Sequence, residues 1–280
     1  MSAAPQADFL AGMAQSSRAR VARARAVRND RELAALAHSR PAPPRLQLSG
    51  EGFDLIAEVK RRSPAAGQLD GGGDDIGARA SDYAQAGAAA ISVLTEPTRF
   101  DGELAHLEQV VQALAGRVPA MRKDFLVDPY QVYEARAAGA GGVLVILRML
   151  QLREIVALLD AAVELGLFVL LEAFDAADLE LAAALVRQYG RRLTLLAGVN
   201  CRDLITLQVV PGRLETLAPQ LPRGVPAVAE SGVENGADVQ RLAAAGYSLA
   251  LVGSALMRSG DRLGLASELI QAGRQGRRCG

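Results

Sequence analysis

The sequence predicts an α/β fold, a single (β/α)8 barrel of the TIM type that follows an N-terminal helical extension. Short and almost wholly apolar runs recur eight times, as expected for parallel strands buried on both faces. Their starts lie 23 to 36 residues apart, which is the size of a βα unit. Nearly every run ends in a charged residue, an Asn or a Gly-Ser pair. Because the carboxyl ends of parallel strands share one face of a barrel, these polar residues are expected to line one pocket.

One domain is favoured, because 280 residues suit a single barrel with a short extension, and no flexible linker interrupts residues 45–270. We expect residues 1–45 to form the helical extension, 46–270 the catalytic barrel and 271–280 a polar C-terminal tail. A doubly wound open sheet is the alternative, but eight units favour closure into a barrel.

The predicted elements follow in order along the chain. Residues 1–40 have the spacing of an amphipathic helical segment, which the prolines of residues 41–44 end. A Gly-rich segment at 71–73 lacks the Gly-Lys-Ser/Thr of a P-loop and is interpreted as a mobile loop. The eight strands are expected to start near Asp54, Ala90, Val118, Gly142, Leu167, Thr194, Pro226 and Leu249.

Helix signals occur between the strands. Asp128 is a plausible N-cap, Pro129 suits the first helical position, and Gly139 suits the residue after the helix end. Residues 235–247 repeat this pattern and end their helix at Gly246. These signals support an alternation of strand and helix through the whole barrel.

Composition excludes several classes of function. With 31 basic and 31 acidic residues, the chain offers no excess charge for nucleic acid. Cys201 and Cys279 lack metal-like spacing, so we expect a reduced, cytoplasmic protein without disulfides. No apolar run approaches the ~20 residues that span a bilayer, and no secretory signal is present, so no membrane partner is expected. The Arg-rich residues 16–28 could be a transit peptide, but Asp30, Glu32 and the helical spacing favour a folded helix.

Two lysines end the first and third predicted strands. A single lysine at such a position is usually a side chain that reaches solvent at the rim. Lys60 and Lys123 face the same mouth, with Glu58 and Phe125 beside them. Apolar walls and a like charge lower the pKa of a lysine, whereas a carboxylate raises it. This competition can prepare an ammonium group to donate a proton, although a simple Glu58–Lys60 ion pair is the alternative.

Three carboxylates, those of Glu58, Glu172 and Glu230, are predicted on the same face. Buried charge is costly unless it is paired or used, and three such groups exceed what stability requires. His38 and His106 lie in the extension and in a helix, away from these carboxylates. No metal site is therefore expected.

Glycine-serine pairs follow the last two predicted strands, as Ser231-Gly232 and Gly253-Ser254. In barrels of this type the last two βα loops present backbone N–H groups to a phosphate. Arg202 follows Asn200 closely and could add a charge-assisted contact. One Gly-Ser pair is usually only a turn, but two at these positions indicate a phosphate site.

Several segments together resemble the indole-3-glycerol phosphate synthase family of tryptophan biosynthesis. They occur in order between about residue 5 and residue 265, and the third is highly specific: IAEVKRRSP, ISVLTEPTRFDG, RKDFLVDPYQVYEARAAGA, GVNCRDL, AESG and LVGSALM. The resemblance implies a carbon-carbon lyase (carboxy-lyase) that uses no cofactor or metal. Its reaction would convert 1-(2-carboxyphenylamino)-1-deoxyribulose 5-phosphate into indole-3-glycerol phosphate, carbon dioxide and water.

The resemblance also implies a role for each matched residue. Lys123 matches the acid at the substrate carbonyl, Lys60 a lysine near the substrate carboxylate, and Glu172 the base or acid of dehydration. The remaining matches orient these groups and the sugar hydroxyls (Glu58, Asn200), complete the polar rim (Glu230, Ser231), bind phosphate (Ser63, Arg202, Gly232, Gly253, Ser254) or form the slot for the anthranilate ring (Phe100, Phe125, Leu144).

The chain departs from the family pattern at four places, one of which is a lengthened unit before the sixth strand at residues 187–193. Ala-Ala follows Ser63-Pro64 where Ser is common, Cys201 takes a position usually held by Asn or Ser, and Arg148 follows the fourth strand where small or neutral residues are usual. We expect Arg148 to affect loop packing or substrate affinity.

Two other functions remain open from the sequence. One is another phosphate-handling barrel enzyme, such as a phosphoribosyl isomerase, which typically needs a Cys/Asp or paired Asp at strand ends. The other is a non-catalytic paralogue that binds phosphorylated metabolites or a partner protein. For the leading function the expected ligand is a small phosphorylated molecule, and the expected state is a monomer, with a weak homo-oligomer as the alternative.

Overall fold

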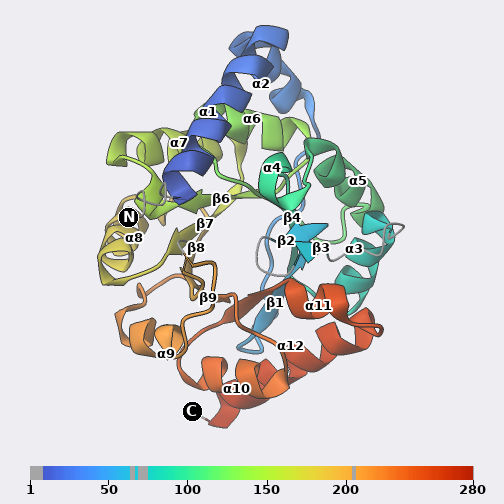
Figure 1. The fold of residues 1–280 in the computed structure, drawn as a ribbon, viewed down its shortest axis with the longest axis vertical. Coiled ribbons are helices and arrows are strands. Elements are labelled where there is room, and N and C mark those ends of the chain that lie inside the picture. Colours follow the sequence, from blue (N-terminus) through green and yellow to red (C-terminus); the bar gives the residue numbers. More distant parts are fainter. Residues whose placement is uncertain (1–8, 64–66, 69–74, 204–205, 280) are drawn as a thin grey trace, which may run out of the picture.

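The computed structural model describes residues 9–63, 67–68, 75–203 and 206–279. In this part of the chain, eight parallel strands form a closed barrel in the order β1-β10-β9-β8-β7-β6-β5-β4, with helices around it (Figure 1). The predicted (β/α)8 barrel is confirmed, and the open-sheet alternative is wrong because β1 pairs with both β10 and β4. The barrel strands are β1 (Asp54–Val59), β4 (Ala90–Leu94), β5 (Ala120–Lys123), β6 (Gly142–Ile146), β7 (Phe168–Ala173), β8 (Leu195–Asn200), β9 (Ala227–Glu230) and β10 (Leu249–Val252).

Helices follow the strands as the cap residues predict. Asp128 accepts a hydrogen bond from the Tyr130 N–H at 2.9 Å, and Gly139 after the helix has a φ of +91°. The helices are α1 (Phe9–Val27), α2 (Asp30–Ser39), α3 (Ile76–Gln85), α4 (Pro97–Phe100), α5 (Leu104–Leu114), α6 (Pro129–Ala137), α7 (Leu152–Leu165), α8 (Ala176–Tyr189), α9 (Arg213–Leu217), α10 (Gly236–Ala244), α11 (Ser254–Arg258) and α12 (Arg262–Cys279). Short elements complete the fold: the hairpin β2 (Arg62–Ser63) and β3 (Gly67–Gln68), and the 3-10 helices η1 (Leu147–Met149) and η2 (Ala218–Gln220).

Alternation along each strand separates an inner from an outer apolar cluster. On β1, Ile56 belongs to the cluster inside the barrel, whereas Leu55 and Ala57 pack against the surrounding helices. Successive side chains of a strand point to opposite faces, so Glu58 shares the inward direction of Ile56. The same alternation directs the polar residues that end the other strands toward the mouth of the barrel.

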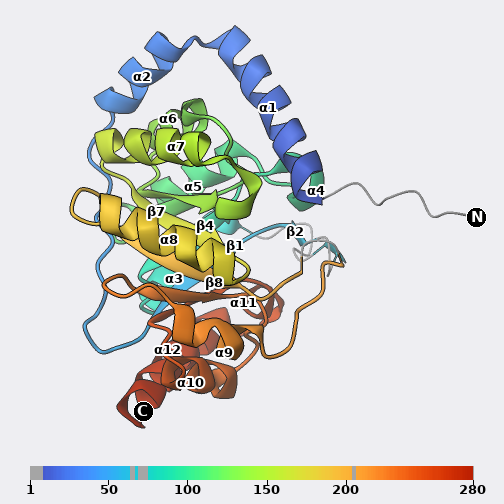
Figure 2. The same cartoon turned by 90° about the vertical axis from the view of Figure 1, so that its left-hand side faces the viewer.

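The N-terminal extension forms two helices that arch over α6 and α7, and α1 descends toward α4 (Figure 2). Arg20 on α1 makes a bidentate ion pair with Asp124, with Nη1 2.9 Å from Oδ2 and Nη2 2.7 Å from Oδ1. The Ser17 hydroxyl donates to the Phe125 carbonyl at 2.5 Å. These contacts attach α1 to the segment that follows β5.

At the other end of the chain, α12 runs without a break through residue 270 to Cys279. The sequence placed a polar tail at residues 271–280, and this division into domains stays a prediction. The Gly-rich segment at 71–73, interpreted above as a mobile loop, lies outside the described residues. None of the described helices has the length and apolar character needed to cross a membrane.

Candidate active site

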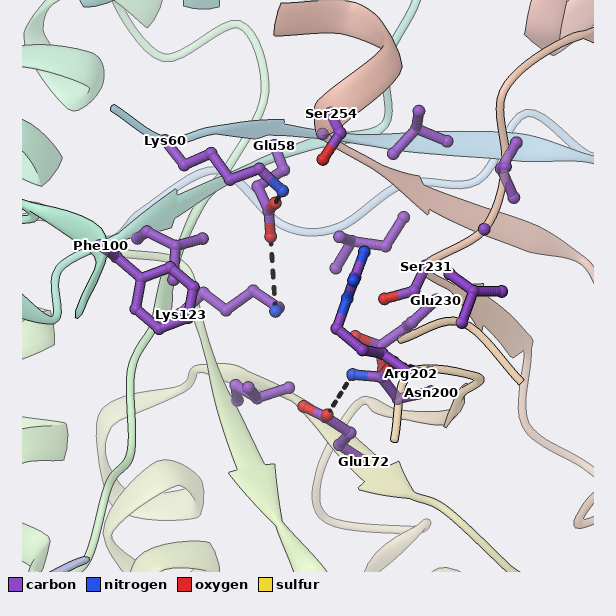
Figure 3. Close-up of a pocket in the computed structure, with 18 of the residues that line it drawn as sticks. Glu58, Lys60, Phe100, Lys123, Glu172, Asn200, Arg202, Glu230, Ser231 and Ser254 are labelled. Atoms are coloured by element: carbon purple, nitrogen blue, oxygen red, sulfur yellow. Dashed lines mark hydrogen bonds and ion pairs between the residues drawn. The ribbon is translucent and has the colours of Figure 1, made fainter. Parts of the chain in front are cut away.

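A pocket opens at the carboxyl ends of the barrel strands, and every predicted site residue except Ser63 lines it (Figure 3). Ser63 lies in β2, and its side chain is outside what the structure describes. The predicted residues that line the pocket are Glu58, Lys60, Phe100, Lys123, Phe125, Leu144, Glu172, Asn200, Arg202, Glu230, Ser231, Gly232, Gly253 and Ser254.

Glu58 lies between the two predicted lysines. Its Oε1 is 2.5 Å from Nζ of Lys60, and its Oε2 is 3.4 Å from Nζ of Lys123 (Figure 3). Burial alone would raise the pKa of Glu58, but the charges of Lys60 and Lys123 outweigh it and lower the pKa to about 2. Glu58 is therefore an anion near neutral pH, and it fixes both ammonium groups in the pocket.

At Lys123, neighbouring negative charge outweighs burial in setting the pKa of the side chain. Burial would lower the pKa of this lysine, but the Glu58 carboxylate, with smaller contributions from Glu172 and Glu230, outweighs burial and raises it. Lys123 is therefore an ammonium ion at neutral pH, the form that can donate a proton.

Glu172 faces Lys123 across the pocket and is held by Asn200. The Asn200 Nδ2 donates to Glu172 Oε1 at 2.7 Å, and the Arg202 N–H donates to Asn200 Oδ1 at 2.9 Å. Burial raises the pKa of Glu172 above its usual value, although Lys123 and Asn200 act in the opposite direction. A carboxyl group with a raised pKa is suited to take up and release a proton.

Glu230 is buried beside Glu172, with 1% of its surface exposed. Neither of its carboxyl oxygens has a hydrogen-bond partner among the residues that the structure describes. Burial and the nearby Glu172 raise the pKa of Glu230 well above its ordinary value. On β8, Gly198 makes this position possible, because a Cβ there would lie 2.2 Å from Glu230 Oε1.

Two glycine turns bound the pocket at the ends of β9 and β10. Ser231 and Gly232 have φ values of +68° and +71°, so two successive residues adopt the left-handed conformation. At Gly253, a Cβ would lie 2.3 Å from Glu58 Oε1 and 2.8 Å from Lys60 Nζ. Only glycine lets the β10 backbone approach this ion pair so closely.

Aromatic rings form one wall of the pocket. Phe100 and Phe125 have ring centroids 6.2 Å apart, and Phe9 of α1 packs edge-on against Phe125 at 5.9 Å. Phe9 was not predicted as a site residue. Its place at the start of an amphipathic helix indicates that the side chain packs inward, but no sequence signal places it at the mouth of the barrel.

Other lining residues also escaped prediction. Leu207 and Val209 belong to the loop after β8, and Asp124 pairs with Arg20 and Arg122 beside the pocket. Loop residues without a chemical signature carry no signal of this kind in the sequence.

The two predicted arginines differ in their surroundings. Arg202 lines the pocket, and its Nη1 donates to the Leu207 carbonyl at 2.6 Å, so its own loop holds the guanidinium. Arg148 is not among the lining residues: it pairs with Asp175 and Asp178 and lies 4.6 Å from the ring centre of Phe174. Arg148 therefore connects the segment after β6 with the start of α8, in line with the expected effect on loop packing.

No group of three or more His, Cys, Asp or Glu side chains that could hold a metal ion occurs among the described residues.

Comparisons with known proteins agree with the geometry of the pocket. A family model described as indole-3-glycerol phosphate synthase matches residues 10–269. The indole-3-glycerol phosphate synthase of Parafrankia sp. (strain EAN1pec) is 45% identical over 226 residues, which cover 81% of each chain. That of Mycobacterium leprae (strain TN) is 39% identical over 269 residues and covers 95% of each chain.

Solved structures with lower sequence similarity share the fold alone. The 3-hexulose-6-phosphate synthase from Salmonella typhimurium has a TM-score of 0.62 at 17% identity, and the match covers 80% of this chain and 100% of that one. Thiamine phosphate pyrophosphorylase from Pyrococcus furiosus has a TM-score of 0.56 at 14% identity, over 81% of this chain and 97% of that one.

Proposed function

The chain belongs to the indole-3-glycerol phosphate synthase family, and from this premise we propose how its residues perform the reaction of that family. The protein is a carboxy-lyase of tryptophan biosynthesis. It converts 1-(2-carboxyphenylamino)-1-deoxyribulose 5-phosphate into indole-3-glycerol phosphate, carbon dioxide and water. The observation that carries the assignment of roles is the convergence of Lys60, Lys123 and Glu172 in one pocket.

Lys123 is the acid of ring closure. An aryl carbon attacks the substrate ketone, and the carbonyl oxygen gains negative charge in the transition state. An ammonium group that is already in place can stabilise this charge and donate a proton without reorganisation. In a site shielded from water, such stabilisation is worth about 3–4 kcal/mol. Glu58 supports this role because its anion holds the Lys123 ammonium in the pocket.

Lys60 and Glu172 serve the steps that follow ring closure. Loss of carbon dioxide restores the aromatic ring, and the Lys60 ammonium suits a position near the departing carboxylate. Dehydration then removes a proton and a hydroxide, which requires a base and an acid on different sides of the substrate. Glu172 has the raised pKa of a group that can do both, and Asn200 holds its orientation.

Binding at the two ends of the substrate orients the reacting groups. The apolar wall that contains Phe100, Phe125 and Leu144 suits the anthranilate ring. The Ser231-Gly232 and Gly253-Ser254 turns suit the phosphate, with Arg202 nearby. Fixing both ends places the aryl carbon close to the ketone, so that the entropy of orienting the two groups is lost on binding and not in the reaction step.

The alternatives receive less support. A non-catalytic paralogue would not need two ammonium groups held by one buried carboxylate, nor a second carboxyl group with a raised pKa. A phosphoribosyl isomerase would need a Cys/Asp or paired Asp at the strand ends. The described strand ends instead bring Lys and Glu into the pocket, and Asp124 there is paired with Arg20 and Arg122. The cytoplasmic location and the monomeric state stay predictions.

The proposal is tested by following indole fluorescence after the synthetic carboxyphenylamino substrate is added to the purified protein. We expect product from the wild type and a kcat about 100- to 10,000-fold lower from Lys123→Ala, the usual loss when a proton donor is removed. Circular dichroism should show that the variant remains folded. Near-normal turnover by Lys123→Ala would contradict the role of Lys123, and no product from the wild type would contradict the function.

A further inference from the structure

Cys201 connects three segments that surround the phosphate end of the pocket. Its N–H donates to the Glu230 carbonyl at 3.0 Å, and its carbonyl accepts from the Val210 N–H at 2.8 Å. Its thiol donates to the Ser231 carbonyl, with 3.3 Å between Sγ and the oxygen. The residue is 2% exposed and belongs to the outer apolar cluster, and it is not among the residues that line the pocket.

The thiol contact fixes the direction of one backbone N–H group. The bond between Ser231 and Gly232 is a trans peptide, so the Ser231 carbonyl and the Gly232 N–H point in opposite directions. The carbonyl points toward Cys201, outside the pocket, whereas Ser231 and Gly232 themselves line the pocket. The Gly232 N–H therefore points away from Cys201, to the side of the peptide opposite the buried thiol. Among the described residues, no group accepts a hydrogen bond from it.

This orientation needs a group that selects it. Ser231 is held at a φ of +68°, a conformation that costs a residue with a side chain about 1–2 kcal/mol. Gly232 tolerates either sign of φ, so sterics alone would allow the peptide between the two residues to rotate. Cys201 lies against this peptide, because a Cβ on Gly232 would be 3.0 Å from Sγ.

The thiol keeps the proton that this contact requires. Burial raises the pKa of Cys201 to about 11, so the group is a neutral S–H donor at neutral pH. Arg202 and Arg213 act in the opposite direction without reversing the effect.

We propose that Cys201 is a positioning residue, whose thiol holds the Ser231–Gly232 peptide with its N–H toward the substrate phosphate. The thiol does not touch the substrate in this arrangement, and it acts through the peptide alone. The inference rests on the proposed function for the identity of the ligand, a phosphate monoester. It goes beyond that function by assigning a role to a residue outside the pocket.

The test compares Cys201→Ala, which removes the donor, with Cys201→Ser, which keeps a donor in nearly the same place. For the alanine variant we expect the KM of the carboxyphenylamino substrate to rise about two- to tenfold, the range of one lost hydrogen bond. Its kcat should stay within about twofold of the wild type. The serine variant should restore most of the affinity, and Cys279→Ser, which removes the other thiol of the chain, should match the wild type.

Binding of inorganic phosphate, measured by calorimetry on the same four proteins, separates this role from the function itself. Its Kd should rise in Cys201→Ala by the same factor as the KM. If the alanine and serine variants lose the same affinity for phosphate, packing and not the hydrogen-bond donor is what matters, and the proposal is overturned. An unchanged Kd in Cys201→Ala would overturn it as well. If the wild type binds phosphate but forms no product, the proposed function fails while the phosphate Kd still decides the role of Cys201.

Discussion

At the scale of single residues, two buried carboxyl groups of the same pocket differ in charge because their neighbours differ. Glu58 contacts the ammonium groups of Lys60 and Lys123, which lower its pKa to about 2 despite its burial. Glu230 has no hydrogen-bond partner among the described residues, and its burial, together with the nearby Glu172, raises its pKa. One glutamate therefore anchors the lysines as an anion, and the other is suited to stay protonated.

A pH titration of stability should detect this state of Glu230. In the unfolded chain a glutamate has a pKa of about 4.3, below the folded-state pKa of Glu230. As pH rises above about 4, the unfolded state loses this proton first, so the wild type loses stability relative to Glu230→Gln. We expect the difference in free energy of unfolding between the two proteins to widen in favour of the variant from pH 4 to pH 8, as measured by urea denaturation.

The matched control for this titration is Glu180→Gln, since Glu180 is exposed on α8. Its difference in free energy of unfolding from the wild type, measured over the same range of pH, is the baseline for the Glu230→Gln difference. A flat difference for Glu230→Gln would mean that Glu230 ionises in the folded protein as it does in the unfolded chain.

At the scale of elements, α1 is part of the active site because it is held in place by few but specific contacts. Arg20 binds both oxygens of Asp124, which is fully buried on its side chain, and Ser17 donates to the Phe125 carbonyl. These contacts place Phe9 against Phe125 at the pocket wall. The docking of one helix therefore completes the apolar wall of the pocket.

Loss of the Arg20 contact should loosen α1 without unfolding the barrel. Hydrogen bonds to charged groups contribute about 1.5–3 kcal/mol, so Arg20→Ala should raise the population of undocked α1 by about tenfold or more. We expect trypsin to cleave within α1 at a correspondingly higher rate, since cleavage follows the population of the open state. The KM should rise in parallel as Phe9 leaves the wall.

Arg23→Ala is the control for this experiment. Arg23 lies on the same helix, is exposed, and has no ion pair with any residue that the structure describes. Removing it deletes one trypsin site, as Arg20→Ala does, but should leave cleavage at the other arginines and the KM unchanged. Equal cleavage of both variants would show that the Arg20–Asp124 contact does not dock α1.

At the scale of the whole molecule, closure of the barrel brings the beginning and the end of the catalytic chain together. β1 pairs with β10, and α12 packs against β1 and α10 (Figure 1). Arg274 pairs with Glu51 at 2.6 Å, and Gly273 lies so close to Phe53 that a Cβ would be 2.2 Å from the ring. Gly273 and Arg274 of α12 therefore cover the amino-terminal end of β1.

Deletion of residues 271–280 should consequently lower the stability of the whole barrel. It would expose Phe53, now 1% exposed, and remove the Arg274 contacts, at a total cost of about 3 kcal/mol. We expect the Tm to fall by about 5–10 °C in calorimetry. Deletion of residues 279–280 alone should change it little, and an unchanged Tm after the longer deletion would show that these contacts do not stabilise the barrel.

The sequence by itself determined the strands, the helix caps and most of the pocket. The eight strands start within two residues of the predicted positions, because buried parallel strands require continuous apolar runs. Lys60, Lys123 and Glu172 could be placed together because strand polarity in a βα array fixes which end of each strand faces the pocket. Such features depend on local sequence and on the symmetry of the fold.

Only the tertiary structure decided which distant groups touch. Phe9 reaches the pocket because α1 folds back over the barrel, and Cys201 reaches Ser231 because β8 and β9 are neighbours in the ring. Burial and charge at distances of a few ångströms decide two further points. They decide whether Glu230 keeps its proton, and whether Arg148 lies in the pocket or pairs with Asp175 and Asp178. Electrostatic and hydrogen-bond energies change steeply over such distances, and spacing along the chain does not specify them.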